Sequence, residues 1–302
     1  MKVAFVIAAV LCSRIAAAQS APPPASGPPL AEVAPAGVTS AELDPTQLPG
    51  FVTIDSFDAS SRAGLEVSYV APNLGSSGVS ATVLRSSAHA RLVDKASGLG
   101  GYARVPWTYE HASLGDRSDT VTDFGDLEVG AIYVPRLPSP HVGLVLHAGI
   151  TAPTGEKLPE ANLGTAASVT ALPEFYNSLP RGTTAKLGVS PTLRSGRVFG
   201  RVDLGLDWNL DAADVAIGKG IHYNAGLGIL AGKVAVMVES QNLSILDTTS
   251  SSHDRVTLSS FAVSARVDAG AVTPYAAVVV PMEDDSSDVV DFAITFGVDF
   301  RL

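Results

Sequence analysis

The stretch that decides the fold is VVDFAITFGVDFRL, residues 289–302. Its apolar side chains recur at every second position: Phe292, Ile294, Phe296, Val298, Phe300 and Leu302. The positions between them are mostly polar or glycine: Asp291, Thr295, Gly297, Asp299 and Arg301. A period of two is the pattern of a β-strand that has one apolar face and one polar face. The chain is therefore predicted to end in an amphipathic strand.

The same alternation recurs from Arg62 onward and predicts twelve strands. Their expected ranges are 62–71, 78–93, 98–110, 123–136, 141–153, 182–194, 197–210, 219–231, 233–243, 255–267, 271–281 and 289–302. Short connections alternate with long ones, as in outer-membrane barrels with tight periplasmic turns and longer external loops. Two ranges are irregular. The apolar face of 78–93 shifts along its length, which implies a bulge or a wrong boundary, and 271–281 is apolar on both faces.

Composition agrees with strands that cross a membrane. The chain is 46% hydrophobic and only 17% charged, yet it has no apolar run of the roughly 18 residues that a spanning helix needs. A soluble β-sandwich would also alternate, but its strands are shorter. Aromatic residues near the expected strand ends, among them Tyr109, Trp208, Tyr223 and Phe300, resemble an interfacial girdle. The fold class expected is all-β, an antiparallel transmembrane β-barrel of about twelve strands.

The N-terminal region indicates export. Residues 1–18 combine Lys2, an apolar stretch and the sequence Ala16-Ala17-Ala18, which fits a secretory signal peptide; a short buried helix is the alternative. Residues 19–61 are rich in Pro and Ala and are expected to be an unstructured periplasmic linker. The barrel would then occupy 62–302, in the outer membrane of a Gram-negative cell envelope. Cys12 is the only cysteine, so the mature chain would lack thiol chemistry.

Short motifs in the middle of the chain suggest a family. They are YARVPW (102–107), GDLEVG (125–130), and GLVLHAGI (143–150) followed by APTGE (152–156). These stretches resemble the outer-membrane family labelled "MetA-pathway of phenol degradation", which is distantly akin to fatty-acid transporter barrels. The resemblance implies a transporter-like barrel for a small hydrophobic or aromatic solute, although no N-terminal hatch like that of the fatty-acid transporters is apparent. For Gly125 and Gly155 a structural role, positive φ at strand–loop junctions, is the simpler interpretation.

Residues on the polar faces of the strands are candidates for the lumen. They are His89, Arg91, Arg104, Glu128, His147, Lys186, Arg201, Asp203, Asp207, His222, Glu239, Asp299 and Arg301. These charges can pair across neighbouring strands and fill the interior, or they can form a selectivity surface that tunes what passes. The sequence leaves both accounts open.

Acidic residues gather in the long connections. They are Asp116 and Asp119; Glu156, Glu160 and Glu174; Asp211 and Asp214; and Glu283, Asp284, Asp285 and Asp288. Solvation explains them, and bridging to lipopolysaccharide through divalent cations is the alternative. Expected partners are thus lipid, lipopolysaccharide, a small solute and the outer-membrane assembly machinery. By resemblance to outer-membrane proteins generally, that machinery would recognise Phe300 and Leu302.

Catalysis, cofactors and nucleic acid are not expected. No Gly-x-Ser-x-Gly string occurs, and the histidines show no metal-ligand spacing. A net charge of −10 opposes phosphate contact. The function predicted is a channel or transporter-like barrel without chemistry. A closed structural or surface-interaction barrel, and a soluble exported binding module, are the alternatives.

Overall fold

The computed structural model describes residues 50–54, 57–58, 60–73, 79–114, 116–155, 168–178, 182–210, 218–246, 256–283, 287 and 290–302. The expected signal peptide, 1–18, and the linker up to residue 49 lie outside this range. Among the described residues, no helix has both the length and the apolar character needed to span a membrane.

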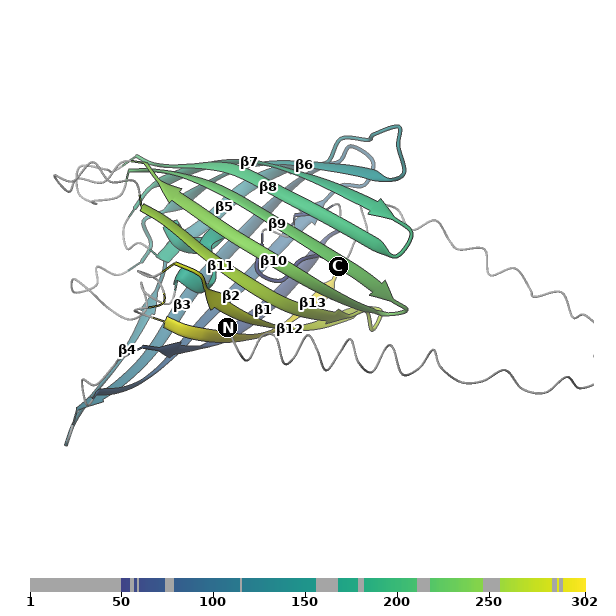
Figure 1. Ribbon diagram of the computed structural model, residues 1–302. Coiled ribbons are helices and arrows are strands. Elements are labelled where there is room, and N and C mark those ends of the chain that lie inside the picture. Colours follow the sequence, from purple (N-terminus) through teal and green to yellow (C-terminus); the bar gives the residue numbers. More distant parts are fainter. Residues whose placement is uncertain are drawn as a thin grey trace, which may run out of the picture. The chain divides into compact units, whose positions relative to one another are not determined.

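The chain forms one closed antiparallel sheet (Figure 1). Its strands are β1 (Arg62–Pro72), β2 (Val79–Val93), β3 (Leu99–Leu114), β4 (Arg117–Phe124), β5 (Leu127–Tyr133), β6 (Val142–Ala152), β7 (Thr184–Ser195), β8 (Val198–Asn209), β9 (Lys219–Ala231), β10 (Val234–Ile245), β11 (Val256–Val267), β12 (Val272–Pro281) and β13 (Val290–Arg301). Strands that follow each other in the sequence pair, except that β5 pairs with β3 instead of β4; β1 also pairs with β13. These pairings close the barrel, because the ring that runs from β1 through β2, β3 and β5 to β13 returns to β1, while β4 pairs with β3 alone.

The wall has twelve positions because β4 and β5 share one. β5 pairs with the first part of β3, over residues 99–104, and β4 pairs with its last part, over residues 107–114. Residues 111–114 and 117–122, expected to lie in a loop, therefore form the end of a hairpin between β3 and β4, which projects past the barrel rim in Figure 1. The apolar alternation stops there because most of β4 is exposed and has no buried neighbour.

The outer surface of the barrel is apolar. Large side chains such as Leu187, Leu204, Leu227 and Phe296 are between 46% and 62% exposed. The outward faces are those that the alternation predicts for β3, β5, β6, β7, β8, β9, β10 and β13. A continuous apolar exterior of this extent is unfavourable in water but suits a hydrocarbon environment.

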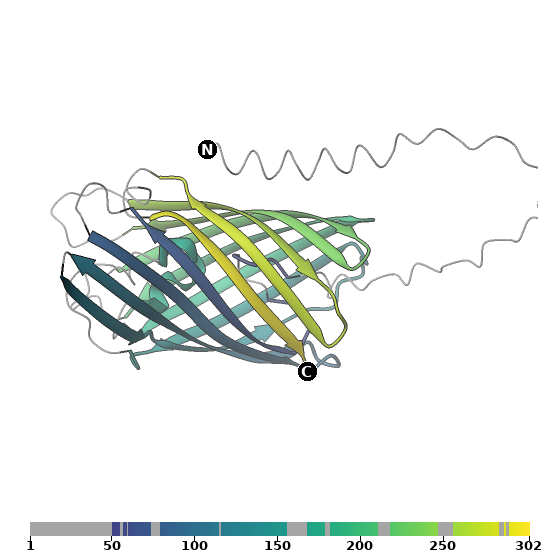
Figure 2. The ribbon, with the colours of Figure 1, turned by 90° about the horizontal axis from the view of Figure 1, so that it is seen from below.

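Two-residue turns join strands at one end of the barrel, which we call the short-turn end. Gly196 and Gly232 open the turns after β7 and β9 with φ of +58° and +63°. Positive φ matches the twist of a tight hairpin, and glycine adopts it without a steric penalty. The C-terminus lies at this end, as Figure 2 shows.

The two irregular ranges have simple structures. β2 pairs with β1 and β3 in continuous register, so the expected bulge is absent from these residues. Val83 points inward, into an apolar cluster that includes Val70 and Leu243. The apolar face shifts because the inner wall is itself apolar there. In β12, Tyr275, Ala277 and Val279 face the interior.

Candidate functional site: the interior of the barrel

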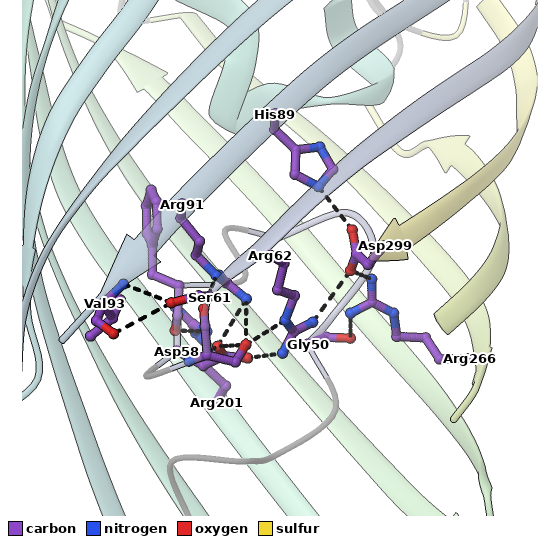
Figure 3. A network of polar contacts seen from close by, with 12 residues as sticks. Gly50, Asp58, Ser61, Arg62, His89, Arg91, Val93, Arg201, Arg266 and Asp299 are labelled. Carbon is purple, nitrogen blue, oxygen red and sulfur yellow. Dashed lines mark hydrogen bonds and ion pairs between the residues drawn. The ribbon is translucent and has the colours of Figure 1, made fainter. Parts of the chain in front are cut away.

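Part of the expected linker lies inside the barrel. We call residues 50–54, 57–58 and 60–61 the inner segment; its Phe51, Ile54 and Phe57 are at most 4% exposed. The assignment of all of 19–61 to an unstructured linker is therefore wrong for these residues. Their composition gave no periodic signal, because they form no regular element. They are ordered by contacts with strands far along the chain (Figure 3).

The carboxylate of Glu239, on β10, binds the backbone at one end of the inner segment. It accepts hydrogen bonds from the amides of Val52 (3.2 Å), Thr53 (2.7 Å) and Ile54 (3.2 Å). The hydroxyls of Thr53 and Ser264 also donate to it. Five donors converge on one buried carboxylate, which compensates for its loss of water.

Guanidinium groups of the wall bind carbonyl groups of the same segment. Arg266 donates to the carbonyl of Gly50 at 2.9 Å, and Arg201 donates to that of Phe57 at 2.7 Å. Arg91 donates to the carbonyl of Ser60 at 2.9 Å. The donors come from β11, β8 and β2, so the wall contacts the segment from several sides (Figure 3).

Asp58 is the charged residue of the inner segment. Its carboxylate forms ion pairs with Arg62 and with Arg91, and it accepts hydrogen bonds from Ser60. Burial alone would raise the pKa of Asp58, but the two guanidiniums and Ser60 outweigh burial and hold its pKa below the usual value. Asp58 is thus held in its ionised form.

Two aromatic side chains of the inner segment fill pockets in the wall. Phe51 packs on Phe199 with ring centroids 5.4 Å apart, and it lies against Gly226, where an added Cβ would come within 2.4 Å of its ring. Phe57 lies between Tyr102 and His147, with centroid distances of 4.7 and 4.5 Å. Because Gly226 has no side chain, the ring of Phe51 can occupy the space beside it.

A second insertion comes from the connection between β6 and β7. It contains two short 3-10 helices, η2 (Ser168–Thr170) and η3 (Leu172–Ser178). Leu172, Phe175 and Tyr176 pack in the apolar cluster that also holds Val83. Lys186 of β7 binds the insertion through the side chain of Asn177 (2.7 Å) and the carbonyl of Pro173 (3.1 Å). This insertion narrows the lumen.

Glu174 was expected to be a solvated loop residue, and the structure contradicts this. Its carboxylate forms ion pairs with Arg85 and Arg104 on the inner wall. Burial alone would raise the pKa of Glu174, but these guanidiniums lower it. Asp119 belongs to β4, and Asp116 and Glu283 are exposed. The remaining acidic positions of the long connections lie outside the described residues: Glu156, Glu160, Asp211, Asp214, Asp284, Asp285 and Asp288.

A cavity of about 60 Å³ lies between the two insertions. It is bordered by Phe51 and Phe57 of the inner segment and by Pro173 and Glu174 of the second insertion. Its polar lining consists mainly of ionisable wall residues: Arg62, Glu66, His89, Arg91, Arg104, Arg266 and Asp299. A water needs about 10–15 Å³ of such volume, so the space holds a few waters at most.

The lumen candidates other than Arg301 are buried or half-buried, and most are in ion pairs. Asp299 binds Arg62, Arg266 and His89, the last at 2.9 Å. The other ion pairs of the wall are Lys186–Glu128 (3.0 Å) and Arg201–Asp203 (2.8 Å), and His222 is hydrogen-bonded to Asp207 (2.9 Å). Arg301 is different: its side chain is 59% exposed and lies 3.7 Å from Asp268. In the alternation of β13, Arg301 belongs to the same inward-facing set as Asp299. It is, however, the last residue of the strand, where the barrel wall ends.

The sequence interpretation missed several interior residues: Asp58, Glu66, Arg85 and Tyr102. Arg85 shares the parity of His89 and Arg91, but the supposed bulge in β2 hid this relation. Glu66 accepts a hydrogen bond from Tyr275 at 3.2 Å and faces Arg85 at 3.7 Å. No parity rule could have found Asp58, because it lies outside the strands.

The motifs at 125–130 and 152–156, which suggested the family resemblance, hold neighbouring segments together through hydrogen bonds. The carboxylate of Asp126 accepts from the amides of Gly155 (2.8 Å) and Gly182 (3.0 Å), and Thr154 accepts from the amide of Leu127 (2.8 Å). Neither Gly125 nor Gly155 has the expected positive φ. Instead, an added Cβ at Gly125 would meet the carbonyl of Asn177 at 2.6 Å. The motifs thus connect the break between β4 and β5 to the second insertion.

The comparisons with known proteins identify the fold of this chain but not a family. No family profile matches the sequence, and no curated protein matches it significantly. An outer membrane channel from Pseudomonas putida F1 matches with a TM-score of 0.59 and 13% identity, covering 84% of this chain and 99% of that one. This chain has the fold of an outer-membrane β-barrel.

More distant matches include the NanC porin (TM-score 0.47, 9% identity, 79% of this chain and 100% of that one). The β domain of the Bordetella autotransporter BrkA also matches (TM-score 0.45, 13% identity, 80% and 100%). Both are too dissimilar to bear on function. In the part of the chain that the structure describes, no cluster of three or more His, Cys, Asp or Glu side chains is arranged to hold a metal ion.

Proposed function

We propose that this chain is an outer-membrane channel that admits a small solute and performs no chemistry on it. The observation that carries the proposal is the contrast between the two faces of the wall. Outward side chains are apolar, while inward ones include Arg91, Glu128, Arg201, Asp203 and Glu239, all under 9% exposed. A barrel that served only as a scaffold could be filled with apolar side chains, whereas charged linings are typical of solute pathways.

The lining favours a polar solute over a hydrocarbon. Guanidinium and carboxylate groups border the central cavity on several sides. A purely apolar solute would displace the water that solvates these groups without replacing its hydrogen bonds. A solute with its own charged or hydroxyl groups can exchange bonds with the wall. This differs from the hydrophobic solute that the family resemblance implies.

A closed barrel with a structural or surface-interaction role is the second candidate. It is favoured by the two insertions, which leave only about 60 Å³ between them. Under that alternative, the ion pairs of the interior serve only to fill the barrel. The channel proposal requires at least one insertion to leave its place.

Solute flux through the purified, refolded full chain tests the proposal. We expect conductance steps in planar bilayers, and liposome swelling with small polar solutes such as sugars and amino acids. Swelling that occurs with aromatic hydrocarbons alone would support the hydrophobic pathway instead. Absence of both conductance and swelling, with the barrel shown to be folded, would establish the closed barrel.

A further inference from the structure

We propose that the barrel wall carries a peptide-binding site, and that the inner segment is its removable occupant, a plug that closes the channel. This proposal rests on the channel function proposed above. The binding site consists of Glu239, the guanidiniums of Arg91, Arg201 and Arg266, and the pockets for Phe51 and Phe57. Its ligand class is a short peptide that bends at residues 52–54, recognised mainly through backbone groups.

The barrel does not need the inner segment for its sheet. The described residues of the segment belong to no strand, and the ring closes through the β1–β13 and β2–β3 pairings. The segment is bound by side chains of the wall, so its departure breaks no strand pairing. A strand in its place would be part of the barrel and could leave only by opening it.

Departure of the segment is possible because its contacts can be exchanged for water. Glu239 and the three arginines are charged groups with other polar wall groups beside them, although the segment also fills apolar pockets with Phe51 and Phe57. Once the segment leaves, water can enter and solvate these groups, whereas burial without partners would be costly. Arg201 and Arg266 also keep their carboxylate partners on the wall, Asp203 and Asp299.

The wall is shaped for this occupant. Gly226 faces the interior between Arg201 of β8 and Glu239 of β10, and Phe51 occupies the space where a Cβ would be. The segment also joins β1 directly, because Ser61 precedes Arg62. Such a short tether keeps the effective concentration of the plug in the millimolar range. This proximity favours closure.

Single-channel recording with point variants of the full chain is the main test. Glu239→Gln removes the charge that binds three amides, and Gly226→Ala places a methyl group against Phe51. Glu239→Gln is expected to raise the open-to-closed ratio about tenfold or more, because hydrogen bonds to a charged acceptor are stronger than those to a neutral one. Gly226→Ala should raise it as well, because the added Cβ would lie 2.4 Å from the ring of Phe51, which must move. Gly200→Ala is the matched control, because its Cβ would find only ordinary contacts at 3.4 Å and beyond. The control should behave like the unmodified chain.

A chemical readout reports the position of the plug without relying on conductance. Thr53→Cys, at a buried position, is introduced into a chain that lacks Cys12, and a membrane-impermeant maleimide is added to the folded barrel. Labelling should be slow in this background and faster when Gly226→Ala is also present. A synthetic peptide of residues 50–61, added to a folded barrel that lacks residues 19–61, should restore closure, and a scrambled peptide should not.

The outcomes separate this proposal from the channel function. Equal conductance in the full chain, in both point variants and in the truncated chain would overturn the plug and leave the channel intact. Unchanged labelling of the cysteine at position 53 in the Gly226→Ala background would also overturn it. Absence of conductance in every folded form, even with faster labelling, would overturn the channel function, and with it the role of the segment as a gate. If the truncated chain does not fold, the point variants decide.

Discussion

At the scale of single residues, position relative to the wall decides what a side chain contributes. Leu204 of β8 is 46% exposed and points away from the barrel, while its neighbour Asp203 is fully buried and pairs with Arg201. One step along a strand thus changes the surroundings from lipid to a network of ion pairs. The two positions tolerate different substitutions for different physical reasons.

The exterior position gives a quantitative prediction. Leu204→Arg places a charge near the middle of the apolar belt and should lower the free energy of unfolding by about 2–4 kcal/mol. The same change at Leu210, just beyond the end of β8, should cost about 0–1 kcal/mol. Denaturant unfolding of the protein in phospholipid vesicles measures both. Equal costs at the two positions would contradict the placement of the belt.

A buried ion pair of the interior, between Lys186 and Glu128, gives a second prediction of stability. Lys186→Met removes the ammonium group that pairs with the buried carboxylate of Glu128 at 3.0 Å, which should cost about 3–5 kcal/mol of stability. Combining it with Glu128→Gln should recover much of that loss, because Tyr102 and Asn177 still provide hydrogen bonds to the side chain. Unfolding followed by tryptophan fluorescence compares the two variants. A double variant as unstable as the single one would show that this ion pair is not the source of the loss.

At the scale of elements, the inner segment and the second insertion differ in how they are held. The second insertion buries apolar side chains of η3 in the largest interior cluster. The inner segment also buries apolar side chains, Phe51 and Phe57, but it adds a charged group, with Asp58 between two guanidiniums. Polar contacts of this kind respond to pH, whereas apolar packing responds little.

The charge of Asp58 predicts the pH dependence of closure. Its pKa is lowered from 3.8 in the bound segment, so the bound form favours the ionised carboxylate. The resulting stabilisation is complete above the ordinary pKa and is lost as pH falls through the lowered pKa. The open-to-closed ratio should be steady from roughly pH 7 to pH 5 and should rise at lower pH. Asp58→Asn should raise the ratio at neutral pH and weaken this dependence. A ratio that rises equally in both chains at low pH would assign the effect to other carboxylates.

At the scale of the whole molecule, closure depends on the last strand. β13 pairs with β12 on one side and with β1 on the other, from Arg62↔Arg301 to Pro72↔Val290. It also presents Phe296 and Phe300 to the exterior. Without β13 the barrel would have two open edges, which hydrocarbon does not tolerate.

Removal of residues 290–302 is therefore expected to abolish insertion. In a heat-modifiability assay, the truncated chain should show no compact species that changes its migration on boiling. Phe300→Ala is a milder companion variant, because it keeps the strand pairings while it removes part of the expected signal for the assembly machinery. A truncated chain that still inserts and migrates as a folded species would contradict closure by β13.

The sequence by itself determined the barrel wall. Alternation predicts the outward faces of β8 and β13 and nearly all strand ends, because burial on one face of a strand is a local property that repeats every second residue. The twelve wall positions follow from the same count, even though the fourth is divided between β4 and β5. His89, Glu128, Asp203 and Glu239 were found as interior residues by parity alone.

Only the tertiary structure decided what fills the interior. The inner segment and η3 have no periodic pattern, and their positions depend on partners far away in sequence, such as Glu239 for Thr53. The inward side of a barrel wall faces whatever part of the chain occupies the lumen. Val83 therefore points inward, where it packs with Phe175 and Tyr176, although valine is equally suited to the lipid-facing side. Alternation reports that a residue has an apolar neighbour, but it does not report whether that neighbour is lipid or another part of the chain.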